Sequence, residues 1–357
     1  MRLLCLGVVL AALVGCGPSG AAPAAPAKPA AGAPPAAPAA TSAPAASAPA
    51  AQPELTPLTL EVAVPTNTAF TWPYFVIRDG PIGAQEHLTV DLTVTETDAR
   101  TAQAVLGGSV EFGEAAFDAV VRAAEQGGDI VTLAGNINRP PYALAVRQGI
   151  DSYDDLRGKK FAVTDLRGGS TLVLKQLLAG HGLRDGDYDL LPLGGTPNRY
   201  GALVNGAADA AMLAQPADFK AEEAGYRLLG YTTENDFQFT TYVTRRSWAE
   251  QNHDKVQRFL RAMVAAHRWL HDPANREQAI ELGMQAFKSS RADVERTWDL
   301  YYVQNAGRVM PREAEVNMAG ADVVVRTLAE LGEIPDGSRG AAPYVDQRPL
   351  QEALRGS

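Results

Sequence analysis

The sequence predicts an α/β fold of two lobes, each a mostly parallel sheet flanked by helices. Between residue 58 and about residue 229, short β-branched runs alternate with helical patterns. Such alternation is typical of parallel sheets covered by helices on both faces. The 304 residues from 54 to 357 suggest two domains or one large one. A stretch of the first half also recurs in the second half, which favours two lobes of similar build.

Nine short runs are expected to be strands. The first ends at Pro65, and after about residue 246 the pattern changes to helices alone. The expected strands lie at 58–64, 87–94, 110–112, 130–133, 143–146, 160–163, 188–193, 208–213 and 226–229. The expected later helices lie at 254–270, 273–287, 292–301 and 312–331, and we expect them to cover the outside of the body.

The internal similarity aligns residues 104–113 with 202–211 at a constant offset of 98 residues. In both segments a helix should end at a C-cap glycine, Gly108 or Gly206, and continue into a short strand. Asp98 and Thr196 are the candidate N-caps of these helices at the same offset. A chance match in an α/β protein is the alternative to a true repeat.

The N-terminus indicates secretion. Arg2 precedes a mostly apolar run at 3–14, which is too short for a transmembrane helix and typical of a signal peptide. The run Leu-Val-Gly-Cys at 13–16 resembles the bacterial lipobox, so Cys16 would be lipidated and become the first mature residue. A plain secreted protein is the alternative. Cleavage would leave a net charge of about −10 and no other thiol, which excludes disulfides and cysteine-bound metals.

A tether follows Cys16. Of the 37 residues at 17–53, 28 are alanine or proline, and such a segment cannot form a packed core. Its polyproline-like extension would reach on the order of 100 Å at about 3.1 Å per residue. We therefore expect a leader at 1–15 and a disordered lipidated tether at 16–53, holding a soluble domain outside the cytoplasm of a bacterial cell. A sequence pI near 5.2 argues against nucleic acid as a partner.

Residues 58 to about 330 resemble solute-binding proteins of the nitrate, sulfonate and taurine type, the group that includes the NMT1/THI5-like domain. The order and spacing of several stretches carry the resemblance: Trp-Pro-Tyr-Phe-Val-Ile at 72–77, His-Leu-Thr-Val-Asp-Leu at 87–92, Leu-Gly-Gly-Ser-Val-Glu-Phe-Gly at 106–113, Pro-Tyr-Ala-Leu-Ala-Val-Arg at 141–147, the run from 150 to 163, Gly-Gly-Ser-Thr at 168–171, and Asn-Gly-Ala-Ala-Asp-Ala-Ala-Met at 205–212. The turn at 79–83 departs from the expected pattern and predicts a shorter first helix.

The resemblance implies a type II periplasmic-binding-protein-like fold, with two crossing strands as the hinge and a ligand between the lobes. Lobe one would comprise 54–148 and 240–357, and lobe two 149–239. The chain would leave lobe one near 146–152 and return along 239–244. Contacts from both lobes to one ligand would then stabilise the closed form.

Ligand contacts are expected on loops beyond the carboxyl ends of the strands. In lobe two the loop at 165–171 opens a helix, and its free N–H groups suggest an anion site. A self-capped helix start is the alternative for this loop, and plain packing is the alternative for Phe70 and Trp72. The candidate ligand residues are Asn67, Phe70, Trp72, Ala115, Ala116, Phe117, Arg139, Arg167, Gly169, Ser170, Thr171, Thr196, Gln215 and Phe237.

Arg139 and Arg167 would come from opposite lobes, and each guanidinium could pair bidentately with a carboxylate or sulfonate. This pair motivates the hypothesis of a small anionic ligand. Catalysis is not expected, because the sequence has no Gly-x-Ser-x-Gly motif and the mature chain has no cysteine nucleophile. His267 and His271 are four residues apart on a helix, but no carboxylate completes a metal site there, and we expect no cofactor.

The resemblance thus implies a monomeric, membrane-tethered receptor of an ABC importer, which hands a small solute to a permease driven by a separate ATPase. A ligand-sensing lipoprotein that signals to a membrane kinase is the alternative, since its folded domain would look the same.

Overall fold

Two five-stranded sheets form the framework of the computed structural model, which describes residues 56–233 and 236–356. The first sheet has the order β2-β1-β3-β10-β4 and the second the order β7-β6-β8-β5-β9. The strands of the first are β1 (Leu58–Val64), β2 (Leu88–Val94), β3 (Phe112–Ala116), β4 (Val131–Gly135) and β10 (Thr240–Thr244). Those of the second are β5 (Ala143–Val146), β6 (Lys160–Val163), β7 (Asp189–Pro192), β8 (Ala210–Leu213) and β9 (Arg227–Tyr231).

Each sheet is mostly parallel, as predicted. In the first, β2, β1, β3 and β4 share one direction and β10 runs against its neighbours β3 and β4. In the second, β5 takes the same role between β8 and β9. The two sheets therefore have the same topology, each completed by one strand that arrives from the other half of the chain. This arrangement confirms the two-lobed α/β prediction.

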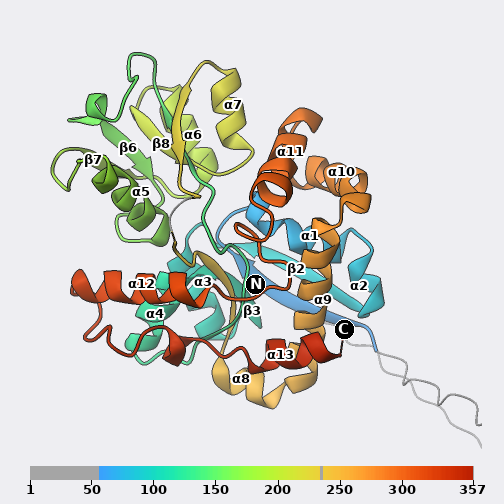
Figure 1. Cartoon of the computed structure of the whole chain (residues 1–357). Helices are drawn as coiled ribbons and strands as arrows, with labels where there is room; N and C mark the ends of the chain where they lie inside the picture. The colour runs from blue at the N-terminus through green and yellow to red at the C-terminus, as the bar shows by residue number, and fades with distance from the viewer. Residues whose placement is uncertain (1–55, 234–235, 357) are drawn as a thin grey trace, which may run out of the picture. The chain divides into compact units, whose positions relative to one another are not determined.

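Helices cover the faces of both sheets (Figure 1). Lobe one carries η1 (Ala69–Thr71), α1 (Trp72–Arg78), α2 (Ile82–Gln85), α3 (Asp98–Gly107) and α4 (Phe117–Glu125). Lobe two carries η2 (Asp154–Leu156), α5 (Gly169–Gly180), α6 (Thr196–Val204) and α7 (Ala217–Glu223). The first helix, α1, ends at Arg78 before the turn at 79–81, so it is short as the sequence predicts.

The offset of 98 residues relates equivalent elements of the two lobes. It relates the starts of α3 and α6 and the starts of β3 and β8. Gly108 and Gly206 both adopt the left-handed conformation, with φ of 71° and 77°. The N-caps lie one residue earlier than predicted, at Thr97 and Gly195. The repeat is therefore a real structural relation between the lobes.

The crossing between lobes lies earlier than the sequence predicted. β5 pairs with β8 and β9, so it belongs to lobe two and not to lobe one, and the first crossing is the segment 136–142. The chain returns through 232–239, of which 234–235 are not described. The crossing segments hydrogen-bond to each other, since the N–H of Phe239 donates to the carbonyl of Ile137 and that of Thr232 donates to Tyr142. The described residues of both crossings are irregular, and regular strand begins only at β5 and β10.

The C-terminal part is helical, as predicted, and belongs to lobe one (Figure 1). It comprises α8 (Arg246–Gln251), α9 (His253–His271), η3 (Pro273–Asn275), α10 (Arg276–Phe287), α11 (Arg291–Trp298), the π-helical turn η4 (Asp299–Gln304), α12 (Met318–Glu330), η5 (Ala342–Tyr344) and α13 (Arg348–Arg355). The helix predicted at 312–331 begins six residues late, because Asn317 caps it by accepting from the N–H of Gly320. None of the helices in the described ranges is both long and apolar enough to span a membrane.

Candidate functional site

A small cavity lies where the two lobes meet, beyond the carboxyl ends of β1 and β6. Its volume is about 20 Å³, roughly the space that one water molecule needs. Lobe one contributes Pro65, Thr66, Phe70, Glu96, Asp98 and Thr240, lobe two contributes Thr164, Gly195, Thr196 and Arg199, and the crossing segments contribute Tyr142 and Phe239. The placement follows the rule for open α/β sheets.

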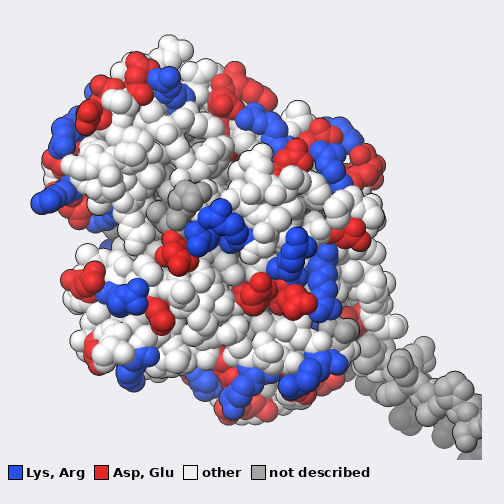
Figure 2. All heavy atoms as spheres, in the orientation of Figure 1, with Lys and Arg blue, Asp and Glu red and all other residues white. Residues whose placement is uncertain are grey.

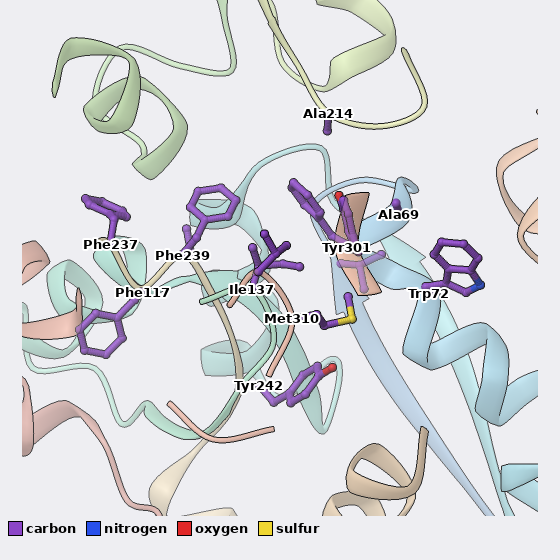
Figure 3. Packing of buried hydrophobic residues seen from close by; sticks show 14 of the residues in the cluster. Ala69, Trp72, Phe117, Ile137, Ala214, Phe237, Phe239, Tyr242, Tyr301 and Met310 are labelled. Carbon is purple, nitrogen blue, oxygen red and sulfur yellow. The ribbon is translucent and has the colours of Figure 1, made fainter. Parts of the chain in front are cut away.

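Three aromatic rings form one wall of this cavity. Phe70, Tyr142 and Phe239 contact one another edge to face, with ring centroids 5.5 to 5.9 Å apart. Figure 3 shows Phe239 beside Ile137 on the side of lobe one that faces Ala214 of lobe two. Because Tyr142 and Phe239 belong to the two crossing segments, a solute against these rings would touch the hinge directly.

Arg199 is the buried cation of the site. It lies in the first turn of α6 and is 2% exposed. Its guanidinium donates to the hydroxyls of Thr164 and Thr196, and its carbon Cζ lies 5.5 Å from the centre of the Tyr142 ring. Its Nε has no hydrogen-bond partner, and no carboxylate of the described chain forms an ion pair with it. Burial lowers the pKa of Arg199.

This charge differs from the charges on the surface. Lys and Arg are interspersed with Asp and Glu over the face drawn in Figure 2. A solvated arginine among such neighbours contributes little to stability. A buried guanidinium without a direct ion-pair partner is costly, and an anion in the cavity would offset that cost.

Buried carboxyl groups of lobe one lie near the cavity. Burial, and then the charge of Asp118, raise the pKa of Asp98 to about 7. Burial raises the pKa of Glu114 to about 8 and also raises that of Asp118. Asp98 is held by the N–H of Ala116, which donates to its Oδ1 over 2.7 Å. The carboxyls therefore hold protons more readily than exposed ones do.

The predicted anion loop of lobe two closes on itself. Asp165 accepts from the N–H groups of Arg167 and Gly168, so the protein's own carboxylate takes the place expected for a ligand. Ser170 donates to Thr164 beside the cavity, and Thr171 donates to the carbonyl of Asp165. Neither Ser170 nor Thr171 lines the cavity. Asp165 thus closes the loop just before α5, while no side chain caps the helix itself.

Gly169 is positioned at the lobe interface. A Cβ there would lie 2.5 Å from Oδ1 of Asp118 in lobe one and 3.0 Å from the ring of Phe239 in the second crossing segment. The lobes approach this closely only because residue 169 has no side chain.

The two arginines expected to bind an anion are paired within the protein. Arg139 lies 3.4 Å from Asp236 on the other crossing segment. Arg167 has a largely exposed side chain and lies 3.0 Å from Glu333, which joins lobe two to lobe one. Neither residue lines the cavity, so the structure does not bring them together around one ligand.

The remaining candidates divide between the site and the core. Phe70 and Thr196 line the cavity. Asn67 donates to the carbonyl of Ala286 and faces a different groove. Trp72 is fully buried against Phe287 and Tyr302, and Figure 3 shows it on the opposite side of Tyr301 from Phe239. These contacts favour packing as the role of Trp72.

Five further candidates are buried near the lobe interface without lining the cavity. Ala115 and Ala116 lie within β3, between β1 and β10, and Phe117 packs on Tyr344. Gln215 joins the lobes, because it accepts from the hydroxyl of Tyr301 and donates to the carbonyl of Pro141. The last candidate, Phe237, is fully buried in the second crossing segment.

Sequence reasoning missed Arg199, Tyr142 and Phe239. Arg199 carries one signal that was readable, since a cation in the first turn of a helix opposes the helix dipole and needs a separate reason. The other two residues carried no signal of their own, because the irregular crossing segments bring them to the cavity.

The two histidines of α9 are structural. His267 contacts the hydroxyl of Tyr242 and the carbonyl of Pro311, and His271 contacts the carbonyl of Met310. Burial lowers the pKa of His267 to about 3 and that of His271 to about 4. They are buried rather than exposed as a polar face. Within the described ranges no group of three or more His, Cys, Asp or Glu side chains is placed to hold a metal.

Two similar sheets exchanging one strand each, with a cavity at their junction, define the periplasmic-binding-protein fold. The chain belongs to the NMT1/THI5-like family, whose model matches residues 84–275. A curated relative, the putative binding protein YtlA of Bacillus subtilis, is 22% identical over 227 residues, which are 61% of this chain and 68% of YtlA.

Solved structures show the same fold at low identity. The alkanesulfonate-binding protein SsuA of Xanthomonas axonopodis pv. citri, bound to MOPS, matches with a TM-score of 0.67 and 18% identity, covering 82% of this chain and 99% of SsuA. The ligand-binding component of an ABC-type import system from Staphylococcus aureus, with zinc bound, matches with a TM-score of 0.69 and 13% identity, covering 83% and 98%. Both of these structures are named for the binding of a ligand.

Proposed function

We propose that this chain is the substrate-binding lipoprotein of an ABC importer, which captures a small anionic organic solute between its lobes and delivers it to a permease. The family and the solved neighbours support solute binding, since one neighbour is named as a component of an ABC-type import system and another as an alkanesulfonate-binding protein. The protein acts as a monomer and binds its solute without altering it.

Arg199 carries the proposal for an anion. Its guanidinium is buried at the lobe junction, donates to two threonine hydroxyls and lacks a carboxylate partner among the described residues. A carboxylate or sulfonate of the solute would accept from Nε and neutralise this charge. The rings of Phe70, Tyr142 and Phe239 would hold the apolar part of the solute.

Capture requires movement of the lobes. A cavity of about 20 Å³ has no room for an organic solute. We infer that the crossing segments flex to admit the solute and that the lobes then close on it, because contacts from both lobes favour the closed form. The permease would recognise that closed form.

The membrane anchor is part of the proposal. Cys16 and the tether lie outside the described residues, and the lipobox sequence supports lipidation of Cys16. Labelling cells with a palmitate analogue should tag the wild-type protein and not the Cys16→Ser variant. If the wild-type protein is not labelled, the proposed lipid anchor is refuted. The binding function would then still be tested separately.

The direct test is a thermal-shift screen of sulfonates, carboxylates, pyrimidines and nitrate. A true ligand at 100 times its Kd should stabilise the protein by about 2.7 kcal/mol, or roughly a few degrees at this chain length. Arg199→Gln should weaken the hit by about 30-fold or more, because truncating one partner of a buried charge pair costs about 2 to 5 kcal/mol.

Arg167→Gln is the matched control, since Arg167 is exposed and paired with Glu333. It should leave the affinity within about twofold of the wild-type value. A hit that binds Arg199→Gln as tightly as the wild type would refute the role of Arg199. A screen without any hit among these classes would refute the anionic solute.

A further inference from the structure

A second and larger cavity lies beside the first. It is a groove of about 470 Å³ between α3 and α4, bounded by the loop 165–168 of lobe two. Asp98 lines both cavities, so the groove adjoins the solute site without being part of it. Because Asp165 comes from lobe two and Asp118 from lobe one, the groove also spans the lobe interface.

Carboxylates gather where the groove meets lobe two. Asp98 and Asp118 stand at the first residues of α3 and α4, and Asp165 stands in the facing loop. Their charges are coupled, because Asp118 and Asp165 both help to raise the pKa of Asp98, and Asp165 helps to raise that of Asp118.

One oxygen of these carboxylates is unpartnered in the described chain, although the other oxygen of the same group is paired with Arg122. The side chain of Asp118 is 1% exposed, and its Oδ1 has no hydrogen-bond partner among the described residues. An acceptor that is buried without a donor is costly, and each such atom requires an explanation. A donor bound in the groove would satisfy it.

The arginines of the groove do not neutralise it. Arg122 is engaged by Asp118, Glu333 and the carbonyl of Arg167, and Arg167 is paired with Glu333. The four carboxylates Asp98, Asp118, Asp165 and Glu333 thus face two guanidiniums. When all four carboxylates are ionised, counting Arg199 of the neighbouring cavity as a third guanidinium still leaves one negative charge in excess.

Apart from Gln103, Gln126 and Gly128, the rest of the groove is lined by alkyl groups. Ala99, Ala102 and Leu106 of α3 face Ala119 and Ala123 of α4 across it. A hydrated metal ion would gain nothing from such walls, because hard cations need oxygen ligands. A cation with an apolar chain would bury that chain against them.

We propose that this groove is a second ligand site, which binds a primary alkylammonium with its charged end against Asp98, Asp118 and Asp165 and its chain between α3 and α4. The occupant bridges the lobes, since its ammonium contacts carboxylates of both. It therefore favours the closed form independently of the solute at Arg199.

The test is calorimetric titration of the full-length protein with hexylammonium chloride, with 1-hexanol as the uncharged probe. The amine should bind saturably and the alcohol should not. Asp118→Asn should weaken binding of the amine about tenfold or more, which is the loss expected for one charge-assisted hydrogen bond. Asp91→Asn, an exposed carboxylate on β2, is the matched control and should bind as the wild type does.

Ala99→Leu keeps the proposal testable if Asp118→Asn folds poorly. Ala99 is exposed on α3 and lines the groove, so leucine there fills the groove without a change of charge or a loss of helix propensity. Ala99→Leu should also weaken binding of the amine. Saturable binding that survives both substitutions, or the absence of any saturable binding, would overturn the site.

Arg199→Gln separates this site from the solute cavity. It should leave amine binding intact even if it abolishes binding of the anionic solute. If Arg199→Gln weakens amine binding as severely as Asp118→Asn does, the cation binds in the solute cavity. That result would overturn the separate site. Failure of the anion screen alone would leave the groove standing.

Discussion

Replacing Glu114 with glutamine should stabilise the folded chain at alkaline pH and change little near pH 4. Glu114 lies on β3 at 1% exposure, beneath the cavity floor formed by Thr240. Its Oε2 has no hydrogen-bond partner in the described part of the chain. Burial raises the pKa of Glu114 from 4.5 to about 8, so the native carboxyl keeps its proton at neutral pH.

The sign follows from proton linkage. Below pH 4.5 the carboxyl is protonated in both states and makes no difference. Between pH 4.5 and about 8 only the folded state holds the proton, so the free energy of unfolding falls as the pH rises. At 1.36 kcal/mol per pH unit, the loss in the free energy of unfolding reaches on the order of 5 kcal/mol by pH 9. Glutamine is neutral throughout and escapes this loss.

Urea unfolding at pH 5, 7 and 9 measures the effect. The wild type should lose stability steadily over this range, and Glu114→Gln should lose less, with the gap widening toward pH 9. Glu223→Gln, an exposed residue of α7, should follow the wild type. Parallel curves for the wild type and Glu114→Gln would refute the reasoning that Glu114 is buried as a protonated acid.

Two further substitutions test packing at the lobe interface and in the core. Gly169→Ala places a methyl group 2.5 Å from Oδ1 of Asp118, so we expect a more open protein with a larger radius of gyration in small-angle scattering; an unchanged radius would contradict the close approach of the lobes. Trp72→Ala should cost about 3 to 5 kcal/mol of stability in urea unfolding. It should leave ligand affinity unchanged, because Trp72 packs on Phe287 rather than in the cavity. A variant with weaker ligand binding and intact stability would contradict that placement.

The sequence predicted the strands whose pattern is local. β1, β5 and β6 begin and end where their apolar runs do. β3 was placed at 110–112 but spans Phe112–Ala116, because its Gly, Glu and Ala residues have little strand preference of their own. Pairing with β1 and β10 makes that segment a strand, and those partners are distant in sequence.

The site was less predictable than the fold. The rule that ligands lie beyond strand ends correctly directed attention to the loops after β1, β6 and β7, and it made Phe70 and Thr196 candidates. Which arginine faces the cavity depends on pairing that only the tertiary structure sets. Arg139 and Arg167 find carboxylates, whereas Arg199 does not.

The most direct test of the proposed function is a crystal structure of the complex with the tightest ligand of the screen. We expect the ligand between the lobes, with its anionic group accepting from the guanidinium of Arg199 and its body against Tyr142 and Phe239. A ligand held by one lobe alone, away from Arg199, would contradict capture between two closing lobes.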